Sequence, residues 1–213
     1  MKLLVVFCLL IPLLYFSWKR WLLTVPQPLP QKLTVAGSGS LLGGRYYEVS
    51  IPPAKLAKYL SAYLSADYRL WIPDGVQTIR GLIVKQHGCG DPAAATGLEH
   101  ANDLQWQALA LKHQFALLGT KIIAGNQPCE RWVIVNYGSG EDFLKAIHAL
   151  SEKSHYPELE EVPWALWGHS GGADWGAQIL QQYPNRTIAL VAARGGGLFF
   201  LGSNPILAEI PVL

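Results

Sequence analysis

Charged residues are scarce in this sequence of 213 residues, where only 15% are Asp, Glu, Lys or Arg while 50% are hydrophobic and 11% aromatic. The sequence also has no visible internal repeat. Chains of this composition bury an apolar core instead of staying extended or disordered. The sequence therefore excludes a disordered, collagenous or low-complexity protein and predicts a globular one.

Acidic residues are missing from the start of the chain, since the first one is Glu48. Residues 1–36 carry Lys2, Lys19, Arg20 and Lys32 with no acid, although the net charge of the whole chain is only +2. The 177 residues that follow hold 13 basic against 15 acidic residues and are formally −2. A nucleic-acid-binding domain presents a strongly basic face, so this balance argues against nucleic acid as a partner.

Residues 3–18 are sixteen uncharged, mostly apolar residues. A basic residue followed by an apolar stretch is the layout of an export signal. As a helix the stretch would be about 24 Å long, short of a hydrocarbon core of about 30 Å, but residues 21–25 could lengthen it. Residues 18–21, Trp-Lys-Arg-Trp, suit a membrane interface and make a poor cleavage site, whereas residues 34–36, Thr-Val-Ala, offer one farther downstream.

We therefore expect residues 1–25 to be a signal peptide or a membrane anchor, and we favour an uncleaved anchor over a cleaved signal or a buried segment. The protein would be membrane-anchored or exported to the periplasm or the extracellular space, with its orientation open because basic residues flank both ends of the segment. Residues 26–44 are rich in Pro, Gly and Ser and predict a linker. The folded domain is expected at residues 45–213, which is enough for one domain and too little for two.

Strand-like and helix-like hydrophobic patterns alternate beyond the linker. Residues 82–84, Leu-Ile-Val, are typical of a buried strand, and Leu56, Leu60 and Leu64 recur at a helical spacing. The predicted strands are residues 45–51, 68–72, 81–86, 115–118, 162–167 and 188–193, and the predicted helices are residues 53–65, 103–113, 141–153 and 173–183. This alternation predicts an α/β fold with a mostly parallel sheet flanked by helices, and function is then expected at the carboxyl ends of the strands.

The sharpest motif is Gly168-His169-Ser170-Gly171-Gly172, which fits G-x-S-x-G with an apolar strand before it and a helix after it. Glycines without a Cβ allow the backbones to approach closely there and hold Ser170 in a strained, exposed conformation. The hydroxyl of Ser170 would lie at the N-terminus of the helix, and the Gly171 N–H would help to bind an oxyanion. The motif predicts a nucleophilic serine, and the alternative is an ordinary strand-to-helix turn.

A second glycine-rich motif, His87-Gly88-Cys89-Gly90, follows the third predicted strand. The two motifs and the order of the elements between them resemble the α/β-hydrolase family over residues 45–200, with esterases and polyester depolymerase-like hydrolases as the most similar members. The resemblance implies that Cys89 supplies the other oxyanion N–H and that His87 braces the loop without being the catalytic base. It further implies no cofactor, and a small-molecule or polymeric ester as the substrate.

The family's catalytic acid and histidine, which follow the nucleophile in the chain, are missing here. No histidine comes after Ser170, and the acids there are Asp174, which the helix dipole explains, and Glu209. Among the preceding histidines only His100, in the loop after the oxyanion motif, is a remote candidate for catalysis. The chain resembles the front part of a hydrolase without the last strand and helix units, and we favour truncation, a frameshift or gene decay over a new triad. Its last strand should then expose an unpaired edge and lower solubility.

Two of the three cysteines, Cys89 and Cys129, follow strands that the family places side by side. The resemblance therefore implies a Cys89–Cys129 disulfide suited to an oxidising compartment, with two free cysteines as the alternative. No spacing of Cys and His residues suggests a metal site, and residues 195–197, Gly-Gly-Gly, lack a phosphate-loop pattern.

Two functions follow from these observations. The first is hydrolysis of carboxylic esters through an acyl-enzyme at Ser170, with oxyanion donors at Cys89 and Gly171. The second is a membrane-anchored, catalytically inactive hydrolase-like fragment or binding module, because the triad acid and histidine are missing. The oligomeric state is left open.

Overall fold

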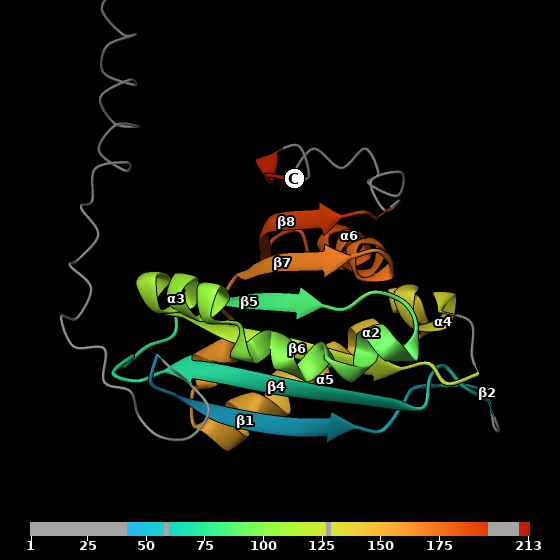
Figure 1. Cartoon of the computed structure of the whole chain (residues 1–213), viewed down its shortest axis with the longest axis horizontal. Coiled ribbons are helices and arrows are strands. Elements are labelled where there is room, and N and C mark those ends of the chain that lie inside the picture. The colour runs from blue at the N-terminus through green and yellow to red at the C-terminus, as the bar shows by residue number, and fades with distance from the viewer. Residues whose placement is uncertain (1–41, 58–59, 127–128, 196–208) are drawn as a thin grey trace, which may run out of the picture. The chain divides into compact units, whose positions relative to one another are not determined.

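Six strands form a mixed sheet in the computed structural model, which describes residues 42–57, 60–126, 129–195 and 209–213. The strands lie in the order β1 (Gly44–Ile51), β4 (Ser65–Pro73), β6 (Phe115–Ile123), β5 (Gly81–Gln86), β7 (Trp164–His169) and β8 (Thr187–Ala193), as Figure 1 shows. β1 pairs antiparallel with β4, and β4 with β6. The β6–β5, β5–β7 and β7–β8 pairs are parallel. The parallel part therefore contains the two strands that end in glycine-rich motifs.

Helices cover both faces of the sheet. They are α2 (Asp91–Ala95), α3 (Leu104–His113), α4 (Glu130–Val133), α5 (Ser139–Ser154) and α6 (Gly171–Gln182), with the 3₁₀ turns η1 (Gly97–Asn102), η2 (Val135–Tyr137) and η3 (Pro157–Glu160). α3 lies on one face and α5 on the other (Figure 1), and the alternation of side chains along each strand feeds a separate core on each side. Trp71 of β4 packs on the α3 side, whereas its neighbour Leu70 packs on the side of α5 and α6.

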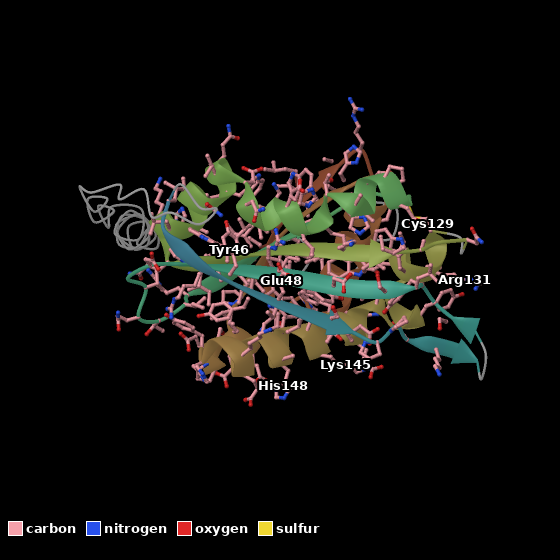
Figure 2. All side chains as sticks on the ribbon, turned by 60° about the horizontal axis from the view of Figure 1, so that its bottom comes forward. Tyr46, Glu48, Cys129, Arg131, Lys145 and His148 are labelled. Atoms are coloured by element: carbon pink, nitrogen blue, oxygen red, sulfur yellow. A yellow bond between two sulfur atoms is a disulfide. The ribbon has the colours of Figure 1, made fainter. Side chains whose placement is uncertain are left out.

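The α5 helix is amphipathic, and its buried face carries one carboxylate. Lys145 and His148 project from α5 on the side away from the sheet (Figure 2). Asp142 is fully buried and accepts hydrogen bonds from the Tyr63 hydroxyl and, at 3.1 Å, from the Ala54 N–H. Lys145 Nζ donates to the other oxygen of Asp142 at 3.1 Å. One carboxylate thus ties α5 to the segment between β1 and β4.

The predicted α/β class, with a sheet flanked by helices, is confirmed, and β5 has the predicted bounds. The helix predicted at residues 53–65 is wrong. This segment instead forms the short antiparallel strands β2 (Lys55–Ala57) and β3 (Leu60–Ser61). Its backbone finds partners outside any helix, since the Ala62 N–H donates to Ala54 O at 2.9 Å and the Leu64 N–H to Ile123 O at 2.7 Å.

The outer edge of β8 is partly paired, which corrects the expectation of a fully unpaired edge. Residues 211–213 run beside it, with a parallel bridge between Leu190 and Val212. The Leu190 N–H donates to Pro211 O at 3.0 Å, and the Ala192 N–H donates to Leu213 O at 2.7 Å. These bonds occupy the edge donors at the carboxyl half of β8.

The predicted signal or anchor, residues 1–25, lies outside the described residues, as does most of the predicted linker at residues 26–44. Within the described ranges, no helix has the length and apolar character needed to cross a membrane.

Candidate active site

Ser170 links β7 to α6 in a backbone conformation that side-chain-bearing residues rarely adopt, with φ 53° and ψ −123°. It is the N-cap residue of α6, and its N–H donates to Ala193 O of β8 at 2.8 Å. A non-glycine residue in this region stores backbone strain and persists only where its surroundings impose the conformation. The geometry is that of a sharp strand-to-helix turn with the serine at its apex.

Two glycines around Ser170 have no room for a side chain. A Cβ on Gly168 would overlap the carbonyl of Gly172, and a Cβ on Gly172 would overlap the carbonyls of Gln86 and His87. The turn therefore packs backbone to backbone against the end of β5. This contact explains why the motif needs glycine at both positions, and it brings the His87-Gly88-Cys89-Gly90 loop next to the serine.

The loop after β5 lies directly against Ser170. A Cβ built on Gly88 would lie 3.4 Å from the Cβ of Ser170 and 3.1 Å from the carbonyl oxygen of His169. Within the part of the chain that the structure describes, the N–H groups of Cys89 and Gly171 donate no hydrogen bond. The first N–H groups of a helix have no partner inside the helix and favour an anion.

His87 is buried, and both of its ring nitrogens are engaged. The Ile122 N–H donates to Nε2 at 2.8 Å, so the ring proton lies on Nδ1, which donates to Gly88 O at 2.6 Å. Burial lowers the pKa of His87 to about 4, which leaves the ring neutral near pH 7. It also packs on the buried Trp132, with the ring centroids 5.1 Å apart. His87 thus holds the loop and has no free nitrogen to offer to Ser170.

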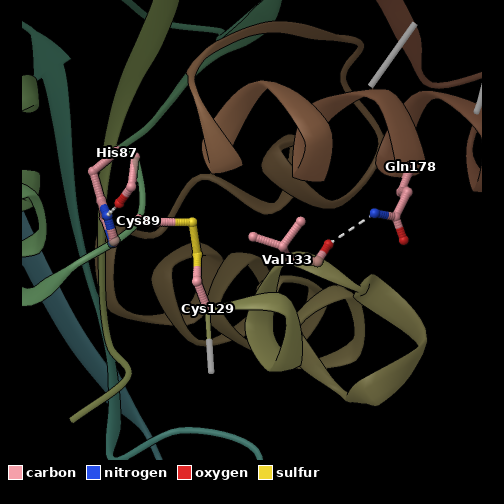
Figure 3. Close-up of a disulfide and its surroundings, with 6 residues drawn as sticks. His87, Cys89, Cys129, Val133 and Gln178 are labelled. Atoms are coloured by element: carbon pink, nitrogen blue, oxygen red, sulfur yellow. Dashed lines mark hydrogen bonds between the residues drawn. A yellow bond between two sulfur atoms is a disulfide. The ribbon is translucent and has the colours of Figure 1, made fainter. Parts of the chain in front are cut away.

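Cys89 and Cys129 form a disulfide with a Cα–Cα distance of 5.6 Å (Figure 3). It joins the loop after β5 to the residue that precedes α4. On the far side of α4, the Val133 carbonyl accepts a hydrogen bond from Gln178 Nε2 of α6 at 3.0 Å, drawn as a dashed line in Figure 3. The His87-Gly88-Cys89-Gly90 loop, here called the glycine loop, is therefore connected to α4 and α6 next to Ser170.

No described histidine or carboxylate makes a hydrogen bond with the Ser170 hydroxyl. His169 is exposed, with Nδ1 3.2 Å from the point that a Cβ of Gly88 would occupy. His148 pairs with Glu160 at 3.0 Å, away from the site. Asp174, in the first turn of α6, has a buried Oδ1 without a partner among the described residues. Among the described residues, the site therefore contains a serine and unengaged N–H groups, with no base hydrogen-bonded to the serine.

A cluster that the sequence analysis missed lies on the α3 face of the sheet. Lys85 of β5 is 4% exposed, and its Nζ lies 4.7 Å and 5.1 Å from the ring centroids of Trp106 and Trp167. Burial lowers the pKa of Lys85, against the opposing effect of Asp103. His100, the remote candidate for catalysis, packs edge-on against Trp167, with ring centroids 5.9 Å apart, and its Nδ1 lies 3.5 Å from Lys85 O. The one signal in the sequence was a lysine directly after the apolar run from Leu82 to Val84 in a predicted buried strand.

The described residues include no group of three or more His, Cys, Asp or Glu side chains arranged to hold a metal ion.

No protein-family model and no curated protein matches the sequence. Solved structures do match, among them an acetyl xylan esterase from Aspergillus awamori with a TM-score of 0.50 at 14% identity, over 76% of this chain and 56% of that one. A second match is the rice cell wall degrading esterase LipA from Xanthomonas oryzae, with a TM-score of 0.48 at 14% identity, over 71% of this chain and 42% of that one. A third is a dienelactone hydrolase from Anabaena variabilis, with a TM-score of 0.46 at 17% identity, over 79% of this chain and 71% of that one. The chain spans about half the length of the first two.

At these identities the likeness concerns the fold. The mixed sheet of six strands flanked by helices is what this likeness concerns. The resemblance predicted from the two motifs is confirmed at that level: the chain has the α/β-hydrolase fold.

Proposed function

We propose that the protein is a serine hydrolase that cleaves carboxylic esters through an acyl-enzyme at Ser170. The observation that carries this proposal is the Ser170 backbone, at φ 53° and ψ −123° between β7 and α6. Strain of this kind costs about 1–3 kcal/mol and clusters at functional sites. A serine kept there, next to two N–H groups that have no partner among the described residues, suits nucleophilic attack on a carbonyl carbon.

In the proposed first step, Ser170 Oγ bonds to the ester carbonyl carbon and its proton passes to water. The carbonyl oxygen becomes an oxyanion, which the N–H groups of Cys89 and Gly171 and the dipole of α6 would stabilise. The bond to the alcohol then breaks, and the alcohol leaves with a proton. Water hydrolyses the acyl-enzyme in the second step, which releases the acid and restores Ser170.

The chain would carry out this reaction slowly, because no described side chain accepts the Ser170 proton. Enzymes of this type that lose triad members keep an acceleration of about 10³–10⁴ over water from the oxyanion hole and binding. We expect activity of that residual kind. The names of the matched esterases support a small-molecule or polymeric ester as the substrate.

The alternative function is a catalytically inactive hydrolase-like fragment or binding module, anchored to a membrane through residues 1–25. It is favoured because, in the part of the chain that the structure describes, no base is hydrogen-bonded to Ser170. A Cys89–Cys129 disulfide suits an exported domain, because disulfides persist in oxidising compartments. Cell fractionation with N-terminal sequencing of the mature protein tests this localisation. A full-length chain in the cytosol would contradict it.

Hydrolysis of p-nitrophenyl acetate by the full chain tests the proposed function. Ser170→Ala should lower the rate below that of the wild type, whereas Ser50→Ala, which removes a hydroxyl bonded to Asp67 on β4, should leave it unchanged. Equal rates for the wild type and Ser170→Ala would remove Ser170 from the mechanism. Turnover near the usual enzyme value of about 10 s⁻¹ would instead exclude the inactive alternative.

A further inference from the structure

Gly171, the first residue of α6, is not required to be glycine by the backbone conformation of the turn. Its φ lies outside the positive region, so its backbone conformation is open to any residue. A Cβ at this position would overlap Sγ of Cys89 and would lie 3.3 Å from Sγ of Cys129 and 3.0 Å from Cγ2 of Val133. The disulfide therefore occupies the space that a side chain on residue 171 would need.

This packing couples the two proposed oxyanion donors, because the disulfide of Cys89 lies against Gly171. Cys89 carries one donor on its own backbone, and its sulfur rests against the Cα of Gly171, which carries the other. If the loop moves, the separation of the two N–H groups changes. An oxyanion hole acts only when its donors are preorganised at the position of the developing charge.

Cys129 is well placed to fix that separation, because it is followed by a helix that is held from two sides. Gln178 of α6 donates from Nε2 to Val133 O at 3.0 Å and accepts at Oε1 from the Val135 N–H at 3.3 Å. On the other side, Trp132 is fully buried against the ring of His87. The disulfide thus ties the glycine loop to a support that is anchored on α6 itself.

We propose that Cys129 is a positioning residue. Through its disulfide with Cys89, it keeps the N–H groups of Cys89 and Gly171 at the separation that an oxyanion needs. This inference rests on the proposed function. A dithiol reductant would give two electrons and two protons to the disulfide, breaking the S–S bond to form two thiols while the reductant closes to its own disulfide. Bonded sulfurs lie about 2 Å apart, whereas unbonded atoms of this size need about 3.5–4 Å, so the two sulfurs must move apart after reduction. Because Gly171 packs closely against Sγ of Cys89, we expect the loop or α4 to shift as they separate.

The test compares the rate of Ser170 labelling by a fluorophosphonate in the oxidised, dithiothreitol-reduced and reoxidised full chain. A shift of about 1 Å in a catalytic group can lower a rate about a hundredfold, so we expect a loss of at least about tenfold on reduction and recovery on reoxidation. Cys129→Ser, which leaves the Cys89 backbone in place, should match the reduced protein and respond no further to dithiothreitol. For p-nitrophenyl acetate, the loss should appear in kcat with KM unchanged. Equal rates in the oxidised and fully reduced chains would overturn the proposal.

Hydrogen exchange separates failure of this inference from failure of the proposed function. Amides in residues 84–93 and 168–176 should exchange faster in the reduced chain, whereas those of β4 should not change. If Ser170 in the oxidised chain is never labelled, the proposed function fails, and the exchange result alone decides whether the disulfide holds the loop. Unchanged exchange in both segments would contradict the positioning role even if the enzyme is active. Near-ultraviolet circular dichroism of the reduced protein checks that the fold persists.

Discussion

Lys85 Nζ donates a hydrogen bond to Asp103 Oδ2 at 2.9 Å, and through it β5 is joined to the N-cap residue of α3. The lysine side chain is 5% exposed and the aspartate side chain 37% exposed. Asp103 Oδ1 also accepts from the Gln105 and Trp106 N–H groups at 3.1 and 3.4 Å. One carboxylate therefore caps a helix and neutralises a buried ammonium group.

Asp103→Asn should lower the free energy of unfolding by about 1–3 kcal/mol, because it leaves the buried ammonium without its counter-ion. Lys85→Met in the Asp103→Asn background should recover part of the loss, since position 85 then holds no buried charge. Urea unfolding of the two variants measures both effects. An Asp103→Asn protein within about 0.5 kcal/mol of the wild type would show that the pair is not important for stability.

Tyr63→Phe should destabilise the fold by about 1–3 kcal/mol, because it removes the hydroxyl that donates to the fully buried Asp142. Burial and the neighbouring Asp142 both raise the pKa of Tyr63, so the hydroxyl keeps its proton at neutral pH. Tyr68→Phe is the matched control, since the Tyr68 hydroxyl is buried without a partner among the described residues. Thermal unfolding should show the larger loss for Tyr63→Phe, and equal losses would contradict the role of Asp142.

The unfolding free energy should fall as the pH falls from about 6.5 to about 4. Burial lowers the pKa of His87 from 6.5 in the unfolded chain to about 4 in the folded protein, so the unfolded chain alone takes up this proton in that window. The loss from His87 amounts to about 3–4 kcal/mol at most, since its pKa falls from 6.5 to about 4 and one pKa unit corresponds to about 1.4 kcal/mol.

A urea titration at several pH values measures this dependence. His87→Gln should be less stable throughout but flatter between pH 4 and 6.5. A slope unaffected by His87→Gln would assign the pH dependence to other groups.

Ser170→Gly should be more stable than Ser170→Ala by about 1 kcal/mol or more, because glycine adopts a φ of 53° without the strain that a Cβ brings. Both variants lack the hydroxyl, so the difference between their unfolding free energies reports the backbone strain at position 170. Differential scanning calorimetry of the pair gives the result. A less stable glycine variant would mean that the turn is not strained.

Local patterns predicted the strands and helices best where burial is continuous along the chain. All six residues of β5 are buried, which matches the apolar run from Leu82 to Val84. The helix predicted at residues 53–65 failed because the leucine spacing says nothing of Asp142, which lies 88 residues from Ala54 and accepts its N–H. β6 runs five residues beyond its predicted end, since β4 pairs with the polar residues Thr120 and Lys121.

In the candidate site, too, local features could be predicted from the sequence, whereas contacts between distant residues could not. The turn at Ser170 is encoded in five consecutive residues, so the motif sufficed to find it. The contacts around Lys85 depend on residues 18 to 82 positions away, Asp103, Trp106 and Trp167, which only the folded sheet brings together. The reason for glycine at position 171 was likewise invisible, because the sulfur atoms that fill the space come from two other loops.

The most direct test of the central claim is mass spectrometry of the full chain after incubation with p-nitrophenyl acetate. Without a base to activate water, deacylation should be slower than acylation, so an acetyl group should accumulate on the peptide that contains Ser170. This adduct should form on the wild type, be absent from Ser170→Ala and persist in Ser50→Ala. No adduct, or an acetyl group on a different serine, would show that Ser170 is not the nucleophile.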